Sequence, residues 1–129
     1  MSRLRLTSKV EIDSSHYLRN YDGKCADLHG HRWVVEVTVE SVTEDAVDSL
    51  DNTGMLLDFG VIKSLISEYD HKNLNDMPEF EDINPTAENL AIVWADALTH
   101  EILLRGIPAK VVSVKVWETP TNSVEFFYD

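Results

Sequence analysis

The sequence predicts an α+β fold, in which an antiparallel four-stranded sheet carries two helices on one face and the elements follow the order β-β-α-α-β-β. Three observations support this prediction. Residues 31–40 alternate between apolar and polar types, two later segments repeat apolar residues at helical spacing, and two further strand-like runs close the chain. At 129 residues the chain has the length of one domain, so we assign residues 1–129 to a single domain.

The first two strands are expected at residues 3–13 and 31–40. The first alternates only in part and ends near His16, whereas the second has a regular apolar side. Because successive side chains of a strand point to opposite faces, His29 and His31 project the same way if the second strand begins by His29. His16 can reach both if the two strands pair antiparallel. The apolar side of the second strand consists of Trp33, Val35, Val37 and Val39.

The first helix is expected to begin after the N-cap Asp58 and to run to about Tyr69. Before it, the acidic residues 44–51 show no core-facing pattern and are interpreted as a loop. After it, residues 73–84 contain Pro78 and are expected to form an irregular connection. The predicted apolar face of this helix consists of Ile62, Leu65, Ile66 and Tyr69.

The second helix is expected to follow the N-cap Thr86 and to end at Gly106, with Pro108 beyond it. Two strands follow, at about 110–118 and 123–128, joined by a turn at residues 120–122. The predicted apolar face of the helix consists of Leu90, Val93, Trp94, Ala97 and Leu98. In the third strand, Val112, Val114 and Val116 are expected to share one face with Glu118.

The composition excludes several classes of protein. The net charge of −12 and the lack of a basic stripe argue against nucleic-acid or anionic-membrane partners, and a phosphorylated substrate would need a local basic pocket. No apolar run has the roughly 20 residues of a membrane span, and the N-terminus lacks the apolar core of a signal peptide. A single cysteine fits a reducing compartment, and we expect a cytoplasmic protein.

The histidines at positions 16, 29 and 31 are candidate metal ligands. A His-x-His pair alone is more typical of two polar residues on an exposed strand face, and a third histidine at the neighbouring strand end gives a metal site equal support. Three imidazoles without a fourth protein ligand are typical of catalytic zinc, although imidazole also suits iron, nickel and copper. His100, on the second helix, is interpreted as a surface residue.

Four further residues carry candidate chemistry, namely Cys25, Asp70, His71 and Glu118. Cys25 is either a small buried side chain or, beside a metal, a thiolate that acts as base or nucleophile. Asp70 and His71 are adjacent, and on their own they are typical of a helix end. If the fold brings His71 to Cys25, the imidazole can take the thiol proton while the carboxylate orients the ring. Glu118 lies on an otherwise apolar strand face, which indicates either a structural pairing or a ligand anchor.

Six segments, in order along the chain, resemble motifs of the 6-pyruvoyl-tetrahydropterin synthase superfamily. The three residues between Cys25 and His29 make a shorter gap than is typical of its pyruvoyl branch, and so favour its 6-carboxytetrahydropterin synthase branch in the queuosine pathway. Serines replace the usual alanine beside His16, and Tyr69 stands where leucine is common. The six segments are residues 14–16, 25–31, 54–59, 70–75, 85–89 and 117–119.

The resemblance implies a tunnelling fold (T-fold) whose trimers close a β-barrel and stack into a homohexamer with active sites at subunit contacts. It implies conversion of 7,8-dihydroneopterin triphosphate to 6-carboxy-5,6,7,8-tetrahydropterin, with loss of acetaldehyde and triphosphate. The implied roles are zinc ligation by His16, His29 and His31, proton transfer by Cys25 with Asp70 and His71, and binding of the pterin by Glu118 and Thr86. Candidate partners of the triphosphate are Arg19, Lys24, Arg32 and Lys72.

Three other functions remain open at this point. A pyruvoyl-forming synthase would eliminate triphosphate from the same substrate without cleaving its carbon chain. A non-catalytic module would bind a pterin or purine and keep the metal for structure only. A metal-free interaction protein would use none of these side chains for chemistry.

Overall fold

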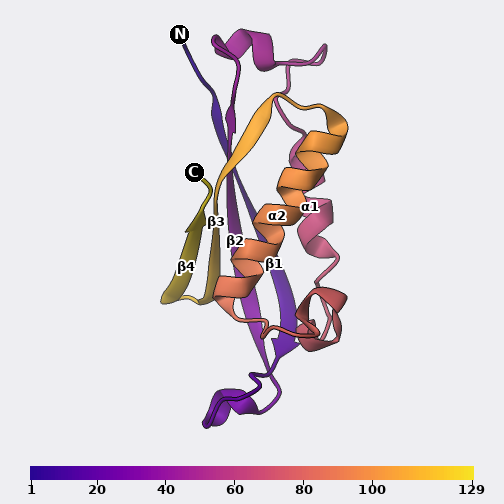
Figure 1. The fold of residues 1–129 in the computed structure, drawn as a ribbon, viewed down its shortest axis with the longest axis vertical. Coiled ribbons are helices and arrows are strands. Elements are labelled where there is room, and N and C mark those ends of the chain that lie inside the picture. Colours follow the sequence, from indigo (N-terminus) through magenta and orange to yellow (C-terminus); the bar gives the residue numbers. More distant parts are fainter.

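The computed structural model describes residues 1–129 and confirms the predicted order of the elements. The four strands form one antiparallel sheet in the order β1-β2-β3-β4, and both helices cover the same face of that sheet (Figure 1). None of the helices is both long enough and apolar enough to cross a bilayer. The elements are β1 (Arg5–His16), β2 (His29–Ser41), α1 (Phe59–Ser67), α2 (Ala87–Arg105), β3 (Ala109–Thr119) and β4 (Asn122–Phe127).

The connections are more ordered than the sequence indicated. The acidic segment predicted as a loop contains the 3-10 helix η2 (Ala46–Ser49), and the predicted irregular connection contains η3 (Leu74–Asp76) and η4 (Pro78–Phe80). A fourth short 3-10 helix, η1 (Lys24–Ala26), lies between β1 and β2. Such short turns carry no apolar periodicity that would predict them.

Both helix starts are capped as the sequence predicted. The Asp58 carboxylate accepts a hydrogen bond from the Gly60 amide at 2.8 Å, and the Thr86 hydroxyl accepts one from the Asn89 amide at 3.1 Å. Each cap satisfies one of the free N–H groups of a first helical turn. At its other end α2 stops at Gly106, whose φ of 64° lies in the left-handed region that suits glycine.

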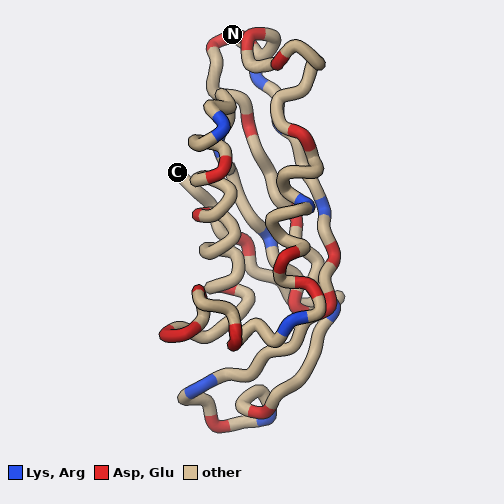
Figure 2. The backbone as a smooth tube through the Cα atoms, turned by 90° about the vertical axis from the view of Figure 1, so that its right-hand side faces the viewer, with Lys and Arg blue, Asp and Glu red and all other residues tan.

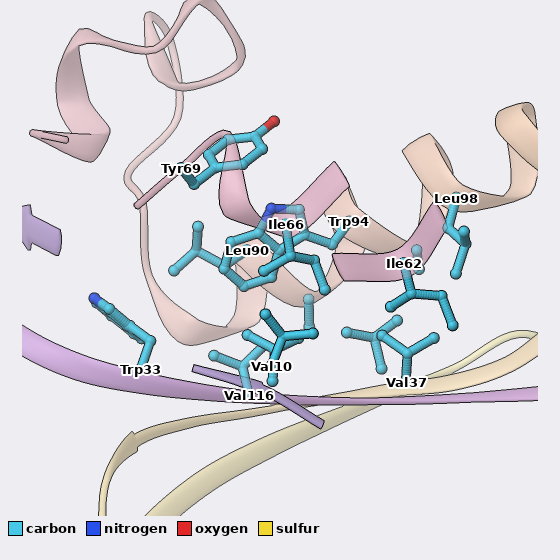
Figure 3. Packing of buried hydrophobic residues seen from close by; sticks show 14 of the residues in the cluster. Val10, Trp33, Val37, Ile62, Ile66, Tyr69, Leu90, Trp94, Leu98 and Val116 are labelled. Carbon is cyan, nitrogen blue, oxygen red and sulfur yellow. The ribbon is translucent and has the colours of Figure 1, made fainter. Parts of the chain in front are cut away.

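The hydrophobic core lies between the sheet and the two helices (Figure 3). Val37 of β2 lies across from Ile62 of α1, and Trp33 lies further along the same strand, next to His16 and His31. The Tyr69 ring packs edge-on against Trp94 with their centroids 5.4 Å apart. Each fully buried side chain of this size contributes roughly 1.5–3 kcal/mol. The face of α2 differs from the prediction, because Ala91 and Ala95 are buried while Val93 and Ala97 are only partly buried.

The expectation that Val112 shares the face of Val114 and Val116 is wrong. Thr38 pairs with Ser113, but the next residue, Val39, pairs with Val111, so Val112 has no partner on β2. Val111 is in the core and Val112 is half-buried. A β-bulge inserts one extra residue and changes the alternation of side chains from that point, and a run of valines does not reveal it.

One end of the sheet gathers the segments that carry the candidate site. In Figure 1 the connection from β1 to β2, the segment after α1, the start of α2 and the turn between β3 and β4 all lie at the lower end. Figure 2 shows acidic residues along the whole length of the molecule with Lys and Arg interspersed, so the basic residues form no continuous stripe. The acidic charge is therefore a feature of the whole surface.

Candidate metal centre and active site

The three predicted histidines converge at the paired ends of β1 and β2. His16, the last residue of β1, lies directly opposite His29, the first residue of β2, and Ser14 lies opposite His31. Because side chains alternate along β2, His29 and His31 share the helix-covered face with Trp33. The three imidazole centroids are 4.6–5.1 Å apart, and one ligand atom from each residue lies within 4.8 Å of the other two.

Two of the rings are oriented by backbone carbonyl oxygens. The Nδ1 atom of His16 donates to the Pro85 oxygen at 2.7 Å, and that of His29 donates to the Asp27 oxygen at 2.7 Å. A carbonyl only accepts hydrogen bonds, so each Nδ1 carries the proton and each neutral ring has its lone pair on Nε2. An N–H to a fixed acceptor is the usual outer contact of a metal-binding imidazole.

The Nε2 atoms of His16 and His31 are buried and have no hydrogen-bond partner in the chain. Burial lowers the pKa of His16 and of His31 below the ordinary value, so both rings are neutral at pH 7. A buried acceptor without a partner destabilises the folded state, and a divalent cation between the three rings would bind these ring nitrogens. The donor set therefore fits a three-histidine metal site with one open position.

Glu118 lies beside this centre. Its Oε1 atom is 3.4 Å from Nε2 of His31, and its side chain keeps about a third of its exposure. The group of mutually close ligand atoms contains the three histidines and does not include Glu118. The carboxylate is therefore next to the centre and accessible to a ligand, as the ligand-anchor interpretation of the sequence requires.

Asp70 and His71 contact one another and the edge of β1. The Oδ1 atom of Asp70 lies 3.0 Å from Nδ1 of His71 and accepts a hydrogen bond from the Asp13 amide at 2.8 Å. The His71 amide in turn donates to the Asp13 oxygen at 2.7 Å, and His71 has a φ of 56°. The amide of Asp13, and then the contact with His71, lower the pKa of Asp70, so this carboxylate is ionised and holds an exposed imidazole.

Cys25 is separate from both groups. It is a free, partly buried thiol on η1, and its backbone oxygen accepts from the Leu18 amide at 2.9 Å. Its side chain makes no hydrogen bond. It belongs neither to the three-histidine group nor to the second group of mutually close ligand atoms, which consists of Asp13, Asp70 and His71. The fold thus brings the three histidines together with Glu118 and joins Asp70 to His71, whereas no hydrogen bond joins Cys25 to His71 within one chain.

Thr86 and the four candidate cations differ in whether their polar groups already have a partner in the chain. The Thr86 hydroxyl accepts the capping hydrogen bond of α2 and keeps its own proton free. Arg32 is committed to a two-point pairing with the Asp13 carboxylate at 3.0 and 3.1 Å, and Arg19 donates to the Ile83 oxygen at 3.2 Å. Lys24 and Lys72 form no ion pair in the chain, which leaves them available to an anion.

The sequence did not indicate the groups that orient the histidines and the Asp70–His71 pair. The oxygens of Pro85 and Asp27 and the backbone of Asp13 are main-chain atoms, so no residue type marks them. Position in the chain was the only available signal. Pro85 immediately precedes the capping Thr86, and Asp13 lies on the same strand as His16.

Comparisons with known proteins agree with this geometry. The family model described as 6-pyruvoyl tetrahydropterin synthase matches residues 5–128. A Rickettsia conorii protein named 6-carboxy-5,6,7,8-tetrahydropterin synthase is 32% identical over 146 residues, covering 95% of this chain and 99% of that protein. A Dictyostelium discoideum protein named 6-pyruvoyl tetrahydrobiopterin synthase is 31% identical over 144 residues, covering 98% of each.

A solved structure supports the fold over the whole chain. The 6-pyruvoyl tetrahydropterin synthase of Caenorhabditis elegans superposes with a TM-score of 0.76 at 24% identity, covering 100% of this chain and 98% of that one. This similarity confirms the predicted four-stranded sheet with two helices on one face.

Proposed function

This chain belongs to the 6-pyruvoyl tetrahydropterin synthase family, and we propose that it is a zinc-dependent lyase acting on 7,8-dihydroneopterin triphosphate. The proposed products, with one water consumed, are 6-carboxy-5,6,7,8-tetrahydropterin, acetaldehyde and triphosphate. The observation that supports this proposal most is the convergence of three imidazoles, two of which have buried, unpartnered Nε2 atoms. We place the reaction in queuosine biosynthesis and the protein in the cytoplasm.

His16, His29 and His31 would hold the zinc ion. When bound, zinc supplies a Lewis acid that polarises the hydroxyl groups of the substrate side chain and acidifies the adjacent C–H bond. The chain's contribution is to fix the rings of His16 and His29 and to keep His16 and His31 neutral. The carbonyl oxygens of Pro85 and Asp27 hold two of the rings, and burial disfavours the protonated form of His16 and His31.

Cys25 would move protons to and from the substrate, with His71 and Asp70 as its relay. His71 is already oriented by the Asp70 carboxylate, as a general base requires. Because no hydrogen bond joins Cys25 to His71 within one chain, we propose that the relay is completed between copies of the chain. This fits the expected dimer of trimers, in which an active site forms where subunits meet.

Glu118 would hold the pterin by its aminopyrimidine edge. A carboxylate accepts two parallel N–H hydrogen bonds from such an edge, and these charge-assisted bonds are stronger than neutral ones. Its place 3.4 Å from His31 supports this role, because the ring would be anchored next to the metal centre. Thr86 would offer its free hydroxyl proton, while Lys24 and Lys72, as unpaired cations, are our first candidates to meet the triphosphate.

Two other functions are distinguished by experiment. The 31% identity to the Dictyostelium protein makes triphosphate elimination without chain cleavage the main alternative. The short gap between Cys25 and His29 favours the carboxy-forming reaction over it. A pterin-binding module without catalysis is the other alternative, and in it Cys25 would have no role in turnover.

The test incubates the zinc-loaded protein with 7,8-dihydroneopterin triphosphate and quantifies acetaldehyde by coupled reduction with NADH. We expect one acetaldehyde per carboxylated pterin. A diketo pterin product without acetaldehyde would support the pyruvoyl alternative, and no turnover would support the binding module. Cys25→Ala should abolish turnover and keep zinc content and assembly, whereas His100→Ala, a change at an exposed histidine of α2, should alter neither.

A further inference from the structure

A cavity of about 740 Å³ lies on the open face of the sheet and reaches the metal centre at His31. Glu118 and Trp117 are neighbours in the sequence, and both line this cavity. Its volume is within the range of small-molecule sites, which is roughly 300–1,000 Å³. Three cations also line it, namely Lys9, Arg32 and Lys115, together with the carboxylate of Glu36.

A β-bulge explains why two consecutive residues reach one cavity. Consecutive side chains of a regular strand point to opposite faces of the sheet. Here Trp117 pairs with Ser123 and Thr119 pairs with Asn122, so Glu118 is an extra residue without a partner on β4. A β-bulge changes the direction in which a side chain points, and such bulges are common next to active sites. This bulge places an aromatic ring and a carboxylate on the same cavity.

The Trp117 ring is held in a fixed orientation. Its Nε1 atom donates to the Glu36 carboxylate at 2.6 Å, and Nζ of Lys115 lies 4.7 Å from the ring centroid. Trp33 and Trp94 are fully buried, with 0% and 1% of their surface exposed, whereas Trp117 is only half-buried. A half-buried indole with a fixed N–H is a preorganised apolar surface for a ligand.

We infer that Trp117 is a binding residue that packs against the bicyclic ring of the pterin while Glu118 holds its aminopyrimidine edge. This inference rests on the proposed function. A pterin is planar and aromatic and carries adjacent N–H donors, so it is recognised by an aromatic surface and a carboxylate acting together. Glu36 and Lys115 are positioning residues, because they act through the indole.

The experiment titrates neopterin, an unreactive planar pterin, into the zinc-loaded protein and into its Trp117→Leu and Trp117→Phe variants. We expect the Leu variant to bind neopterin roughly tenfold more weakly, since stacking on an aromatic side chain contributes about that much for a planar base. The Phe variant should stay within about threefold of the unmodified protein. Phe127→Leu changes an exposed aromatic residue of the same sheet that does not line the cavity, and it should leave the affinity unchanged.

Turnover separates this inference from the proposed function. If Trp117 binds the ring, the Leu variant should raise KM by about tenfold and leave kcat and zinc content unchanged. Equal neopterin affinity in the Leu variant and the unmodified protein would overturn the inference and leave the proposed reaction intact. Failure of the unmodified protein to bind neopterin would overturn both. Binding that depends on Trp117 without turnover would support the inference and contradict the proposed reaction.

Discussion

The Nδ1 atom of His16 donates a hydrogen bond of 2.7 Å to the Pro85 carbonyl oxygen, which joins the end of β1 to the residue before the N-cap of α2. This contact fixes the tautomer of His16 and leaves Nε2 as a buried acceptor without a partner. The metal centre is therefore linked to the packing of a helix on the sheet. Loss of the metal should therefore affect the packing of α2, and loss of that packing should affect metal binding.

His16→Ala should reduce bound zinc to less than about a tenth of the unmodified level, because it removes one of three neutral ligands. In the unmodified protein, zinc should raise the thermal midpoint, and a chelator should reverse the increase, because a ligand that binds only the folded state stabilises it. Elemental analysis and thermal melts check both effects. His100→Ala is the control, and equal zinc in His16→Ala would contradict the assignment.

Asp70→Asn should lower kcat by about 10²–10⁴-fold and leave zinc content unchanged. The asparagine oxygen can still accept from the Asp13 amide, so the backbone should stay in place, but the negative charge beside His71 is lost. Steady-state kinetics measure the effect. A variant with normal kcat would show that His71 needs no carboxylate, and the proposed relay would fail.

Glu118→Gln should raise KM by roughly 10–100-fold, because a hydrogen bond to a charged group contributes about 1.5–3 kcal/mol. The amide keeps the shape of the side chain, but an NH2 donor replaces one of the two acceptor oxygens, so the pair of parallel N–H hydrogen bonds is lost. Glu101→Gln, which changes an acidic residue paired with Arg105 on α2, is the matched control and should not change KM. A KM equal to that of the control would remove Glu118 from the pterin site.

Alkaline pH should destabilise the fold through Tyr69. Burial, followed by the negative charge of Glu79, raises the pKa of this phenol from 10.0 to about 12. The unfolded chain therefore loses the phenolic proton first, and the stability that Tyr69 contributes is complete below pH 10 and is lost as the pH rises toward 12. Denaturant unfolding at pH 8 and pH 11 should show this loss, and Tyr69→Phe should show less of it.

Leu90→Ala should lower the free energy of unfolding by about 2–5 kcal/mol, because Leu90 is fully buried in the core between α2 and the sheet. Leu103→Ala, at an exposed position of the same helix, should cost less than about 1 kcal/mol. Chemical denaturation of both variants measures the difference. Equal losses would contradict the described packing of α2.

The elements were predictable where local chemistry decides them. The alternation at 33–39 and the caps Asp58 and Thr86 each satisfy a requirement of a single strand or helix, and the structure confirms them. The convergence of His16 with His29 also followed from antiparallel pairing of consecutive strands. Each of these features depends on residues close in sequence.

The remaining features depend on partners far away in the sequence. The bulges at Val112 and Glu118 arise from the pairing of three strands, and no residue type in β3 marks them. The tie between Asp70 and the Asp13 amide joins residues 57 positions apart through a backbone atom. For the same reason the sequence left open whether Cys25 and His71 meet, and within one chain no hydrogen bond joins them.

The most direct test is anomalous diffraction at the zinc absorption edge from crystals of the purified protein. We expect one zinc peak per chain, at roughly 2.0–2.1 Å from a ring nitrogen of each histidine at positions 16, 29 and 31. A peak at another site, or three imidazoles at these positions with no ion between them after zinc loading, would contradict the account.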